Sequence, residues 1–292
     1  MKQEREFHFT QSDFARVCQL IYEHAGISLG ESKQELVYSR LSRRLRATGI
    51  QTFAEYLRLL ESNDVVEWEE FTNSMTTNLT SFFREPHHFP LLAEQLRTLS
   101  GKHPVNLWCS AASTGEEPYS MAMTVMDVMG RNASQVNIIA TDLDTKVLVT
   151  AREGIYSEDK IAKLAPDIVK RFFQRGTGKQ AGMVNVRQEL RDMISFRPLN
   201  LLHDNWSIRY PIDAIFCRNV MIYFDKPTQL AILKKFVPLL RNNGLLYAGH
   251  SESFHHADAY VKLRGKTVYE LSETARRLNL EHAAKLEEQK FK

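Results

Sequence analysis

Apolar residues between positions 10 and 75 recur every three or four residues, which is the spacing of amphipathic helices. In the first such segment Phe14, Val17 and Ile21 share one face, and a glycine follows the last turn. The pattern predicts helices at 10–26, 32–49, 52–60 and 66–75. Because none of these segments alternates as a strand does, residues 1–75 are predicted to form an all-helical N-terminal domain.

From residue 104 onward, short apolar runs rich in β-forming residues alternate with helical stretches. Strands are predicted at 105–109, 136–140, 194–196, 212–217, 244–248 and 267–271, and helices at 117–129 and 227–240. This alternation is typical of parallel strands joined by crossover helices. The expected fold class is therefore α/β, with a Rossmann-like domain over 104–271 that follows a linker at 76–103.

Two segments depart from this alternation. A turn-rich stretch with Gly176, Gly178 and Gly182 precedes two short apolar runs, 183–187 and 193–197, which are expected to pair with each other. Residues 176–197 are thus predicted to form a small antiparallel β-subdomain inserted in the larger domain. The charged stretch at 272–292 has weak helical periodicity and is expected to be a C-terminal tail in the form of a solvated, frayed helix.

Composition narrows the classes of function. The chain has 292 residues, 43% of them hydrophobic and 25% charged, and no apolar run approaches the ~20 residues that span a bilayer. The start, MKQEREFHF, lacks the layout of a signal peptide, and the three cysteines show no paired spacing. These features predict a reduced, cytoplasmic protein without membrane insertion. A net charge of +3 does not by itself indicate a nucleic-acid partner.

Candidate chemistry lies where the first two predicted strands end. The stretch AASTGEEPYS at 111–120 places small residues and Gly115 between a strand and a helix, where ligands of open α/β sheets bind. Glu116 and Glu117 would repel a phosphate, and Asp142, after the second strand, can accept both hydroxyl groups of a ribose. Together they indicate an adenosine-type ligand without phosphates, of which S-adenosylmethionine is the obvious example. An acidic residue after a strand is, however, often only a helix N-cap or a solvated turn.

Four longer motifs carry a family resemblance: TTNLTSFFRE at 76–85, ASTGEEPYS at 112–120, FCRNVMIYFD at 216–225 and GHSE at 249–252. In this order, over residues 10–271, the chain resembles the CheR family of chemotaxis receptor methyltransferases. The resemblance implies an S-adenosylmethionine-dependent methyltransferase domain with an inserted β-subdomain, behind a helical domain. It implies methyl transfer to glutamate side chains of chemotaxis receptors, with S-adenosylhomocysteine as product.

The resemblance also implies roles for single residues. Asn78, Thr80 and Arg84 of the linker are expected to close over the methionine end of the cofactor. Glu117 is expected to hold that end as well, or the neighbouring edge of the ribose. Asp142 is expected to bind the ribose, and Asn200 and Leu201 to lie near the adenine. Arg218 and Asn219 are expected to contact cofactor or substrate, and the implied catalytic residues are Arg84, Arg218 and Tyr223.

The acceptor proposed by the resemblance simplifies the chemistry. A glutamate carboxyl group, with a pKa of ~4.3, is ionised at neutral pH and needs no general base. Catalysis is therefore expected from alignment and the exclusion of water, with Arg84 or Arg218 orienting the carboxylate. The histidines at 87, 88, 250, 255 and 256 lack the spacing of a metal site, so no metal is expected.

Two features suggest how a receptor is recognised. The second predicted helix carries a basic group, Arg40, Arg43, Arg44 and Arg46, suited to an acidic receptor helix bundle, although such a charge run is often only a solvated face. The glycine loop at 176–182 resembles that of family members that bind a receptor C-terminal peptide as an added strand. No nucleic-acid partner is expected, since aromatic residues are not interleaved with the basic ones, and the protein is expected to be a monomer.

Two rival functions remain at this stage. A methyltransferase of the same fold could act on another protein, an RNA or a small molecule. A non-enzymatic module could sense S-adenosylmethionine and signal through a partner. The first would have no use for the basic helix or the β-subdomain, and the second would not need Arg84, Arg218 and Tyr223 together.

Overall fold

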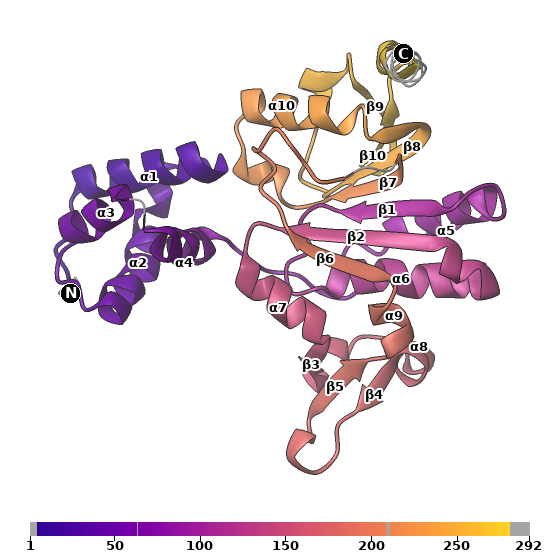
Figure 1. Cartoon of the computed structure of the whole chain (residues 1–292), viewed down its shortest axis with the longest axis horizontal. Helices are drawn as coiled ribbons and strands as arrows, with labels where there is room; N and C mark the ends of the chain where they lie inside the picture. The colour runs from indigo at the N-terminus through magenta and orange to yellow at the C-terminus, as the bar shows by residue number, and fades with distance from the viewer. Residues whose placement is uncertain (1–4, 63, 209–210, 281–292) are drawn as a thin grey trace, which may run out of the picture.

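The chain folds into a helical domain and a larger α/β domain that lie side by side, joined by a linker (Figure 1). The structure, a computed structural model, describes residues 5–62, 64–208 and 211–280. Within this part of the chain, no helix is both long and apolar enough to cross a membrane.

The helical domain consists of α1 (Gln11–Ala25), α2 (Gln34–Thr48), α3 (Phe53–Glu61) and α4 (Val65–Met75). Thr10 forms a capping box with Asp13 at the start of α1, and Gly26 ends the helix in the left-handed conformation, with φ of 68°. Val17, Ile21, Leu41 and Tyr56 are fully buried in its core. The all-helical prediction is confirmed, with helix ends within two residues of those expected.

The main sheet has seven strands in the order β6-β2-β1-β7-β8-β10-β9. Its strands are β1 (Val105–Cys109), β2 (Val136–Asp142), β6 (Ile194–Pro198), β7 (Ile212–Cys217), β8 (Leu240–Ala248), β9 (Val261–Gly265) and β10 (Val268–Leu271). From β6 to β8 in this order, neighbouring strands pair in parallel. The pairs β8–β10 and β10–β9 are antiparallel and complete the sheet. The predicted α/β sheet is confirmed, and β9 is a strand that the sequence pattern did not reveal.

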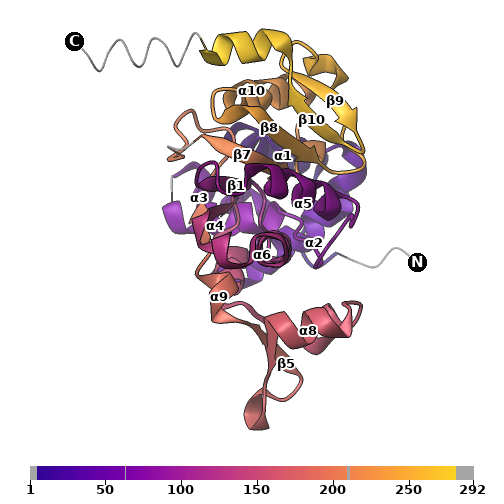
Figure 2. The ribbon, with the colours of Figure 1, turned by 90° about the vertical axis from the view of Figure 1, so that its right-hand side faces the viewer.

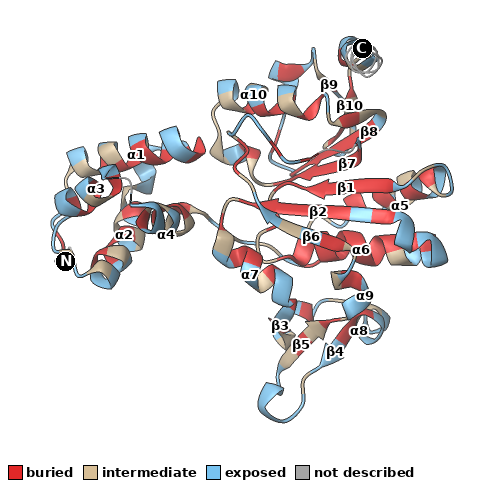
Figure 3. Cartoon of the chain, viewed as in Figure 1, coloured by how far each residue is buried: buried red, intermediate tan, exposed pale blue. Residues whose placement is uncertain are grey.

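Helices cover both faces of this sheet (Figure 3). The helices are α5 (His88–Leu99), α6 (Glu116–Met129), α7 (Thr145–Glu153) and α10 (Lys226–Phe236). Along β1, Leu107 belongs to the core cluster that contains residues of α5, α6 and α7, whereas its neighbour Trp108 belongs to the cluster that contains residues of α10. This alternation follows the two-residue period of a strand, with both faces apolar because both are covered. Helix α5 occupies the second half of the segment predicted as a linker.

The pairing predicted for the β-subdomain is wrong. The small sheet has the order β3-β5-β4, formed by β3 (Ile155–Ser157), β5 (Met183–Val186) and β4 (Phe173–Arg175), all antiparallel. The segment expected to pair with β5, residues 193–197, instead falls in β6 and pairs in parallel with β2 of the main sheet. The seven residues between β5 and β6 hold the short helix α9 (Gln188–Arg191) rather than a hairpin turn, so the chain leaves the small sheet there.

The small sheet lies away from the body of the molecule, together with α8 (Pro166–Phe172) (Figure 2). After β10, residues 273–280 form a helix, and Ala275 is fully buried. The predicted charged tail therefore begins as a packed helix, and its remainder, 281–292, lies outside the described residues.

Candidate active site

The main pocket lies at the carboxyl ends of β1, β2, β6 and β7, on the side facing the helical domain. Its empty space is about 900 Å³, part of which is open solvent. It is lined by every residue predicted for cofactor binding or catalysis: Asn78, Thr80, Arg84, Glu117, Asp142, Asn200, Leu201, Arg218, Asn219 and Tyr223. Ala25, Ile27 and Met75 of the helical domain complete the wall, a contribution that no local sequence signal indicated.

The turn between β1 and α6 brings backbone close to this pocket. Ser113 and Gly115 have positive φ values of 48° and 100°, and the amide of Ala112 donates to the carbonyl of Thr141 on the neighbouring strand. A Cβ atom at Gly115 would meet the Tyr156 hydroxyl oxygen at 2.8 Å and the Cβ of Ala151 at 2.9 Å. Both the backbone conformation and the close packing therefore require glycine at this position.

Asp142 ends β2 as a nearly buried carboxylate. Its Oδ2 accepts a hydrogen bond of 2.7 Å from the Ser113 amide, and its Oδ1 accepts one of 2.9 Å from the Asp144 amide. Burial raises the pKa of Asp142 to about 6, although these two amides favour the charged form. Each oxygen keeps a lone pair, so hydroxyl donors in the pocket can add to the two amides.

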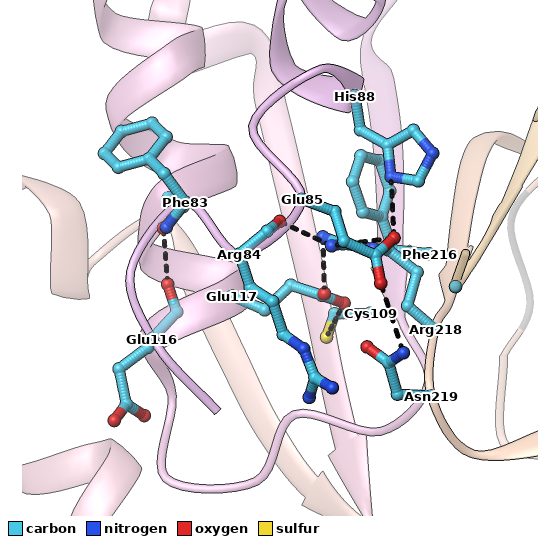
Figure 4. Close-up of polar contacts among 12 residues, drawn as sticks. Phe83, Arg84, Glu85, His88, Cys109, Glu116, Glu117, Phe216, Arg218 and Asn219 are labelled. Atoms are coloured by element: carbon cyan, nitrogen blue, oxygen red, sulfur yellow. Dashed lines mark hydrogen bonds and ion pairs between the residues drawn. The ribbon is translucent and has the colours of Figure 1, made fainter. Parts of the chain in front are cut away.

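Glu117 and Arg218 form a buried ion pair beside the pocket (Figure 4). The Arg218 Nη1 donates to Glu117 Oε2 at 2.9 Å, and the Cys109 thiol donates to Glu117 Oε1 at 3.2 Å. Burial raises the pKa of Glu117, while the charge of Arg218 opposes that shift. Arg218 also donates to the Arg84 carbonyl, so its guanidinium joins the end of β7, helix α6 and the linker.

The linker is held to the α/β domain on its way past the pocket. The Asn78 amide donates to Asp144 Oδ2 at 2.8 Å, and the Ser113 hydroxyl donates to the Asn78 carbonyl at 3.1 Å. The Arg84 side chain lies apart from the Glu117–Arg218 pair, and its Nη1 donates to the Leu79 carbonyl at 2.7 Å. Arg84 is thus placed at the wall of the pocket and is only partly buried.

Asn200 has a structural contact that the sequence did not predict. Its amide donates to the His24 carbonyl at the end of α1, and its Oδ1 accepts from the Leu202 amide. The side chain expected near an adenine therefore also fixes the helical domain to the floor of the pocket.

The loop after β7 is shaped by a carboxylate from the GHSE motif, to which the sequence assigned no role. Glu252 accepts hydrogen bonds from the amides of Asn219, Val220 and Met221, and Asn219 has a positive φ of 58°. A Cβ at Gly249 would lie 2.4 Å from the Asn219 side-chain nitrogen. Glu252 and Gly249 together set the place of Asn219 at the pocket, while the carbonyl of Tyr223 accepts from the Ser28 amide of the helical domain.

The four arginines of α2 do not form one free basic face. Arg44 binds Glu67 and Glu70, Arg46 binds Glu6, and Arg40 donates to the Met75 carbonyl and the Thr77 hydroxyl at the start of the linker. Arg43 is exposed, with no hydrogen bond or ion pair to another residue in the described part of the chain. Three of the four charges are therefore already engaged within the protein.

The glycine loop connects β4 and β5 of the small sheet. Gly178 and Gly182 have φ values of 60° and 84°, and a Cβ at Gly176 would lie 2.1 Å from the Gln180 carbonyl oxygen. The conformation of the loop alone therefore explains why all three positions are occupied by glycine.

Among the described residues, Glu85, His87 and His88 offer ligand atoms within 4.8 Å of one another. The Arg218 guanidinium lies 3.4 Å from the same Glu85 carboxylate. A positive charge at that distance opposes the binding of a metal cation there.

Comparisons with known proteins agree with this geometry. A family model for the all-alpha domain of CheR methyltransferase matches residues 12–76, and one for its SAM binding domain matches residues 78–269. The chain is 54% identical to a chemotaxis protein methyltransferase of Escherichia coli (strain K12), over 90% of this chain and 92% of that protein. It is 52% identical to chemotaxis protein methyltransferase 2 of Pseudomonas aeruginosa, over 91% of this chain and 95% of the relative.

Among solved structures, PKMT2 from Rickettsia typhi in complex with AdoHcy is 14% identical, with a TM-score of 0.36, and covers 59% of this chain and 26% of its own. A structural similarity with so low a TM-score adds no evidence to the family matches.

The raised pKa of Asp142 predicts a pH dependence of cofactor binding. Hydroxyl donors favour the charged carboxylate, so binding must remove a proton once the pH falls below about 6. The affinity for S-adenosylhomocysteine is expected to be constant above pH 7 and to fall below pH 6, by up to about tenfold per pH unit. Titration calorimetry from pH 5.5 to 8 measures this effect.

The Asp142→Asn variant serves as the control, because it cannot titrate. It should bind more weakly at pH 8 and show no loss of affinity between pH 7 and 5.5. An unchanged pH profile in this variant would assign the dependence to another group.

Proposed function

This chain belongs to the CheR family of methyltransferases, and on that premise we propose that it transfers the methyl group of S-adenosylmethionine to glutamate side chains of methyl-accepting chemotaxis receptors. The observation that carries the proposal is the convergence of the linker, four strand ends and the helical domain on one pocket. The products would be glutamate methyl esters and S-adenosylhomocysteine.

The residues present suit this cofactor. The pocket contains two nearly buried carboxylates, Glu117 and Asp142, on opposite sides of the turn that carries Gly115. A phosphate would be repelled there, whereas a ribose and a ligand with positive charge would be bound. We assign Asp142 to the ribose hydroxyls and Glu117 to the amino group of the methionine end. Asn78, Thr80, Arg84 and Asn219 then surround that end, and Asn200 and Leu201 lie beside the adenine.

The bound cofactor supplies an electrophilic methyl group on a positively charged sulfur. The chain's own task is to align a carboxylate that is already ionised and to exclude water, so a general base is not needed. Of the two candidate arginines, the contacts favour Arg84 for orienting the substrate carboxylate. The side chain of Arg218 is fully buried and bound to Glu117, whereas Arg84 contacts the Leu79 carbonyl at the pocket wall. Tyr223, at the same wall, would support this alignment.

We further propose that the cytoplasmic helix bundle of a receptor docks on the face of α2 that bears Arg43. Arg43 is the exposed member of the group, while Arg40, Arg44 and Arg46 are engaged within the protein and contribute less free charge. A receptor C-terminal peptide could add to the small sheet, whose outer strands β3 and β4 each pair on one side only, with Gly176, Gly178 and Gly182 beside them. We propose accordingly that the enzyme acts in the cytoplasm, and that it does so as a monomer.

The rival functions predict different products. A methyltransferase for RNA, a small molecule or another protein would label those substrates instead, and a sensing module would bind the cofactor without turnover. The close family relationship and the complete pocket favour the receptor enzyme over both.

Incubation with labelled S-adenosylmethionine and receptor membranes tests the proposed function. Label is expected in the receptors and should be released as methanol by mild base, because carboxyl methyl esters hydrolyse there whereas methylamines do not. Receptors with the target glutamates replaced by alanine provide the control. Base-stable label, or no label with wild-type receptors, would exclude protein-glutamate methylation.

Replacing Arg84 tests the assigned alignment. In Arg84→Ala, kcat is expected to fall about 100-fold because an orienting charge is lost at the reacting carboxylate. The thermal unfolding midpoint should change little, since the side chain is only partly buried. The matched control is Arg58→Ala, an exposed arginine on α3. Unchanged methylation by well-folded Arg84→Ala protein would remove Arg84 from the mechanism.

Charge reversal at α2 tests the docking face. In Arg43→Glu, KM for receptor is expected to rise about fivefold at low salt and less at high salt, because exposed charges are screened. Affinity for S-adenosylhomocysteine should not change. Lys102→Glu makes the same charge change just before β1, at the opposite end of the sheet. Equal KM increases in both variants, or a salt-independent effect, would argue against docking at Arg43.

A further inference from the structure

Glu85 is a linker residue that contacts several groups beside the pocket, although it does not line the pocket itself. Its Oε1 accepts from the Asn219 side-chain amide at 3.2 Å and from the His250 backbone amide at 3.2 Å. The ring of His250 contacts the same oxygen at 2.9 Å, and Oε2 lies 3.4 Å from the Arg218 guanidinium. One carboxylate thus joins the linker to the ends of β7 and β8. Figure 4 shows Glu85 beside Arg218 and Asn219.

The backbone around Glu85 is strained. Phe83 and Glu85 have φ values of 51° and 53°, in the left-handed region that residues with a Cβ rarely adopt. Three contacts hold this conformation besides the Glu85 carboxylate: the Phe82 ring packs against Tyr156 and Phe173, the Phe83 amide donates to Ser120, and the Arg84 carbonyl accepts from Arg218. Arg84 therefore reaches the pocket from a backbone segment whose conformation depends on these contacts.

Glu85 also completes the charge balance of the site. The Arg218 side chain is fully buried between Glu117 and Glu85, whose side chains are each only 9% exposed. Burial acts to raise the pKa of Glu85, but His250, Arg218 and Asn219 together lower it to about 2, so the carboxylate is ionised at neutral pH. Two negative charges therefore flank Arg218, and the positive potential of its guanidinium toward the pocket is reduced.

We propose that Glu85 is a positioning residue that fixes Arg84, Arg218 and Asn219 around the methionine end of the cofactor and lowers the positive potential there. Its carboxylate favours the binding of the charged cofactor over that of the product. S-adenosylmethionine carries a net positive charge at its sulfonium, whereas the sulfur of S-adenosylhomocysteine is uncharged. The inference rests on the cofactor placement proposed above and adds a residue that acts through its neighbours.

The test measures dissociation constants for both ligands by titration calorimetry on the full chain, without receptor. In Glu85→Gln the shape is kept and the charge is lost, so the dissociation constant of S-adenosylmethionine is expected to rise about tenfold. That of S-adenosylhomocysteine should rise less than about threefold, because no sulfonium is repelled. Glu153→Gln, the same change at an exposed position on α7, should alter neither constant.

A purely structural role would weaken both ligands equally, and that result, or no change in either constant, overturns the proposal. If Glu85→Gln does not fold, His250→Lys provides the second variant, because the ring is 67% exposed and a lysine there sets a fixed positive charge beside the Glu85 carboxylate and offsets its negative charge. It should weaken S-adenosylmethionine more than S-adenosylhomocysteine, and an unchanged ratio of the two constants overturns the proposal. Failure of the wild-type chain to bind either ligand would instead reject the cofactor placement itself.

Discussion

The arrangement of the residues around the pocket depends on the buried guanidinium group of Arg218. It lies at the end of β7 and binds Glu117 of α6, the Arg84 carbonyl and the Glu85 carboxylate of the linker. A buried charge costs several kcal/mol of desolvation, so it persists only where partners surround it, and removing one partner costs about 3–5 kcal/mol. The linker is therefore held closed over the strand ends by the same ion that fixes the orientation of Glu117.

On the acidic side of the pocket, burial is only partly compensated by hydrogen bonds and ion pairs. Asp142 and Glu117 are both nearly buried, and burial raises both pKa values. Because its folded-state pKa of about 6 lies above the unfolded value of ~3.9, Asp142 lowers the stability of the free protein as the pH rises from about 4 to about 6, and the full cost is present above pH 6. Hydroxyl and amino donors of a ligand relieve that cost. Part of the binding free energy thus comes from carboxylates that are poorly solvated in the free protein. In the closed pocket, a ligand with hydroxyls and positive charge satisfies these carboxylates better than water does.

Local pattern was enough to predict most elements, together with Glu117 and Asp142, whereas the other pocket residues were predicted from the family resemblance. Strands β1 and β7 were predicted with their observed bounds because continuous apolar runs reflect burial on both faces. The pairing of β5 failed because strand partners depend on where α9 directs the chain, which a period-two pattern does not encode. Glu85 and Glu252 were missed for a related reason: their partners lie 134 and about 30 residues away, and only the folded sheet brings them together. The engagement of Arg44 and Arg46 was missed too, since the glutamates that bind them come from α4 and the segment before α1.

The helical domain forms one wall of the pocket and is tied to it at several points. Asn200 bonds to the His24 carbonyl, the Tyr223 carbonyl accepts from Ser28, and the Tyr22 hydroxyl donates to Asp225. On α2, Arg43 faces solvent while Arg40 bonds to the carbonyl of Met75, where α4 ends, and to Thr77 at the start of the linker. A partner held by Arg43 would therefore lie only one helical turn from an arginine that anchors the pocket-closing segment. Because the same rigid helix carries both side chains, the docking proposed at Arg43 would couple the place of the substrate to the closure of the cofactor site through one element, without any need for a long path between them.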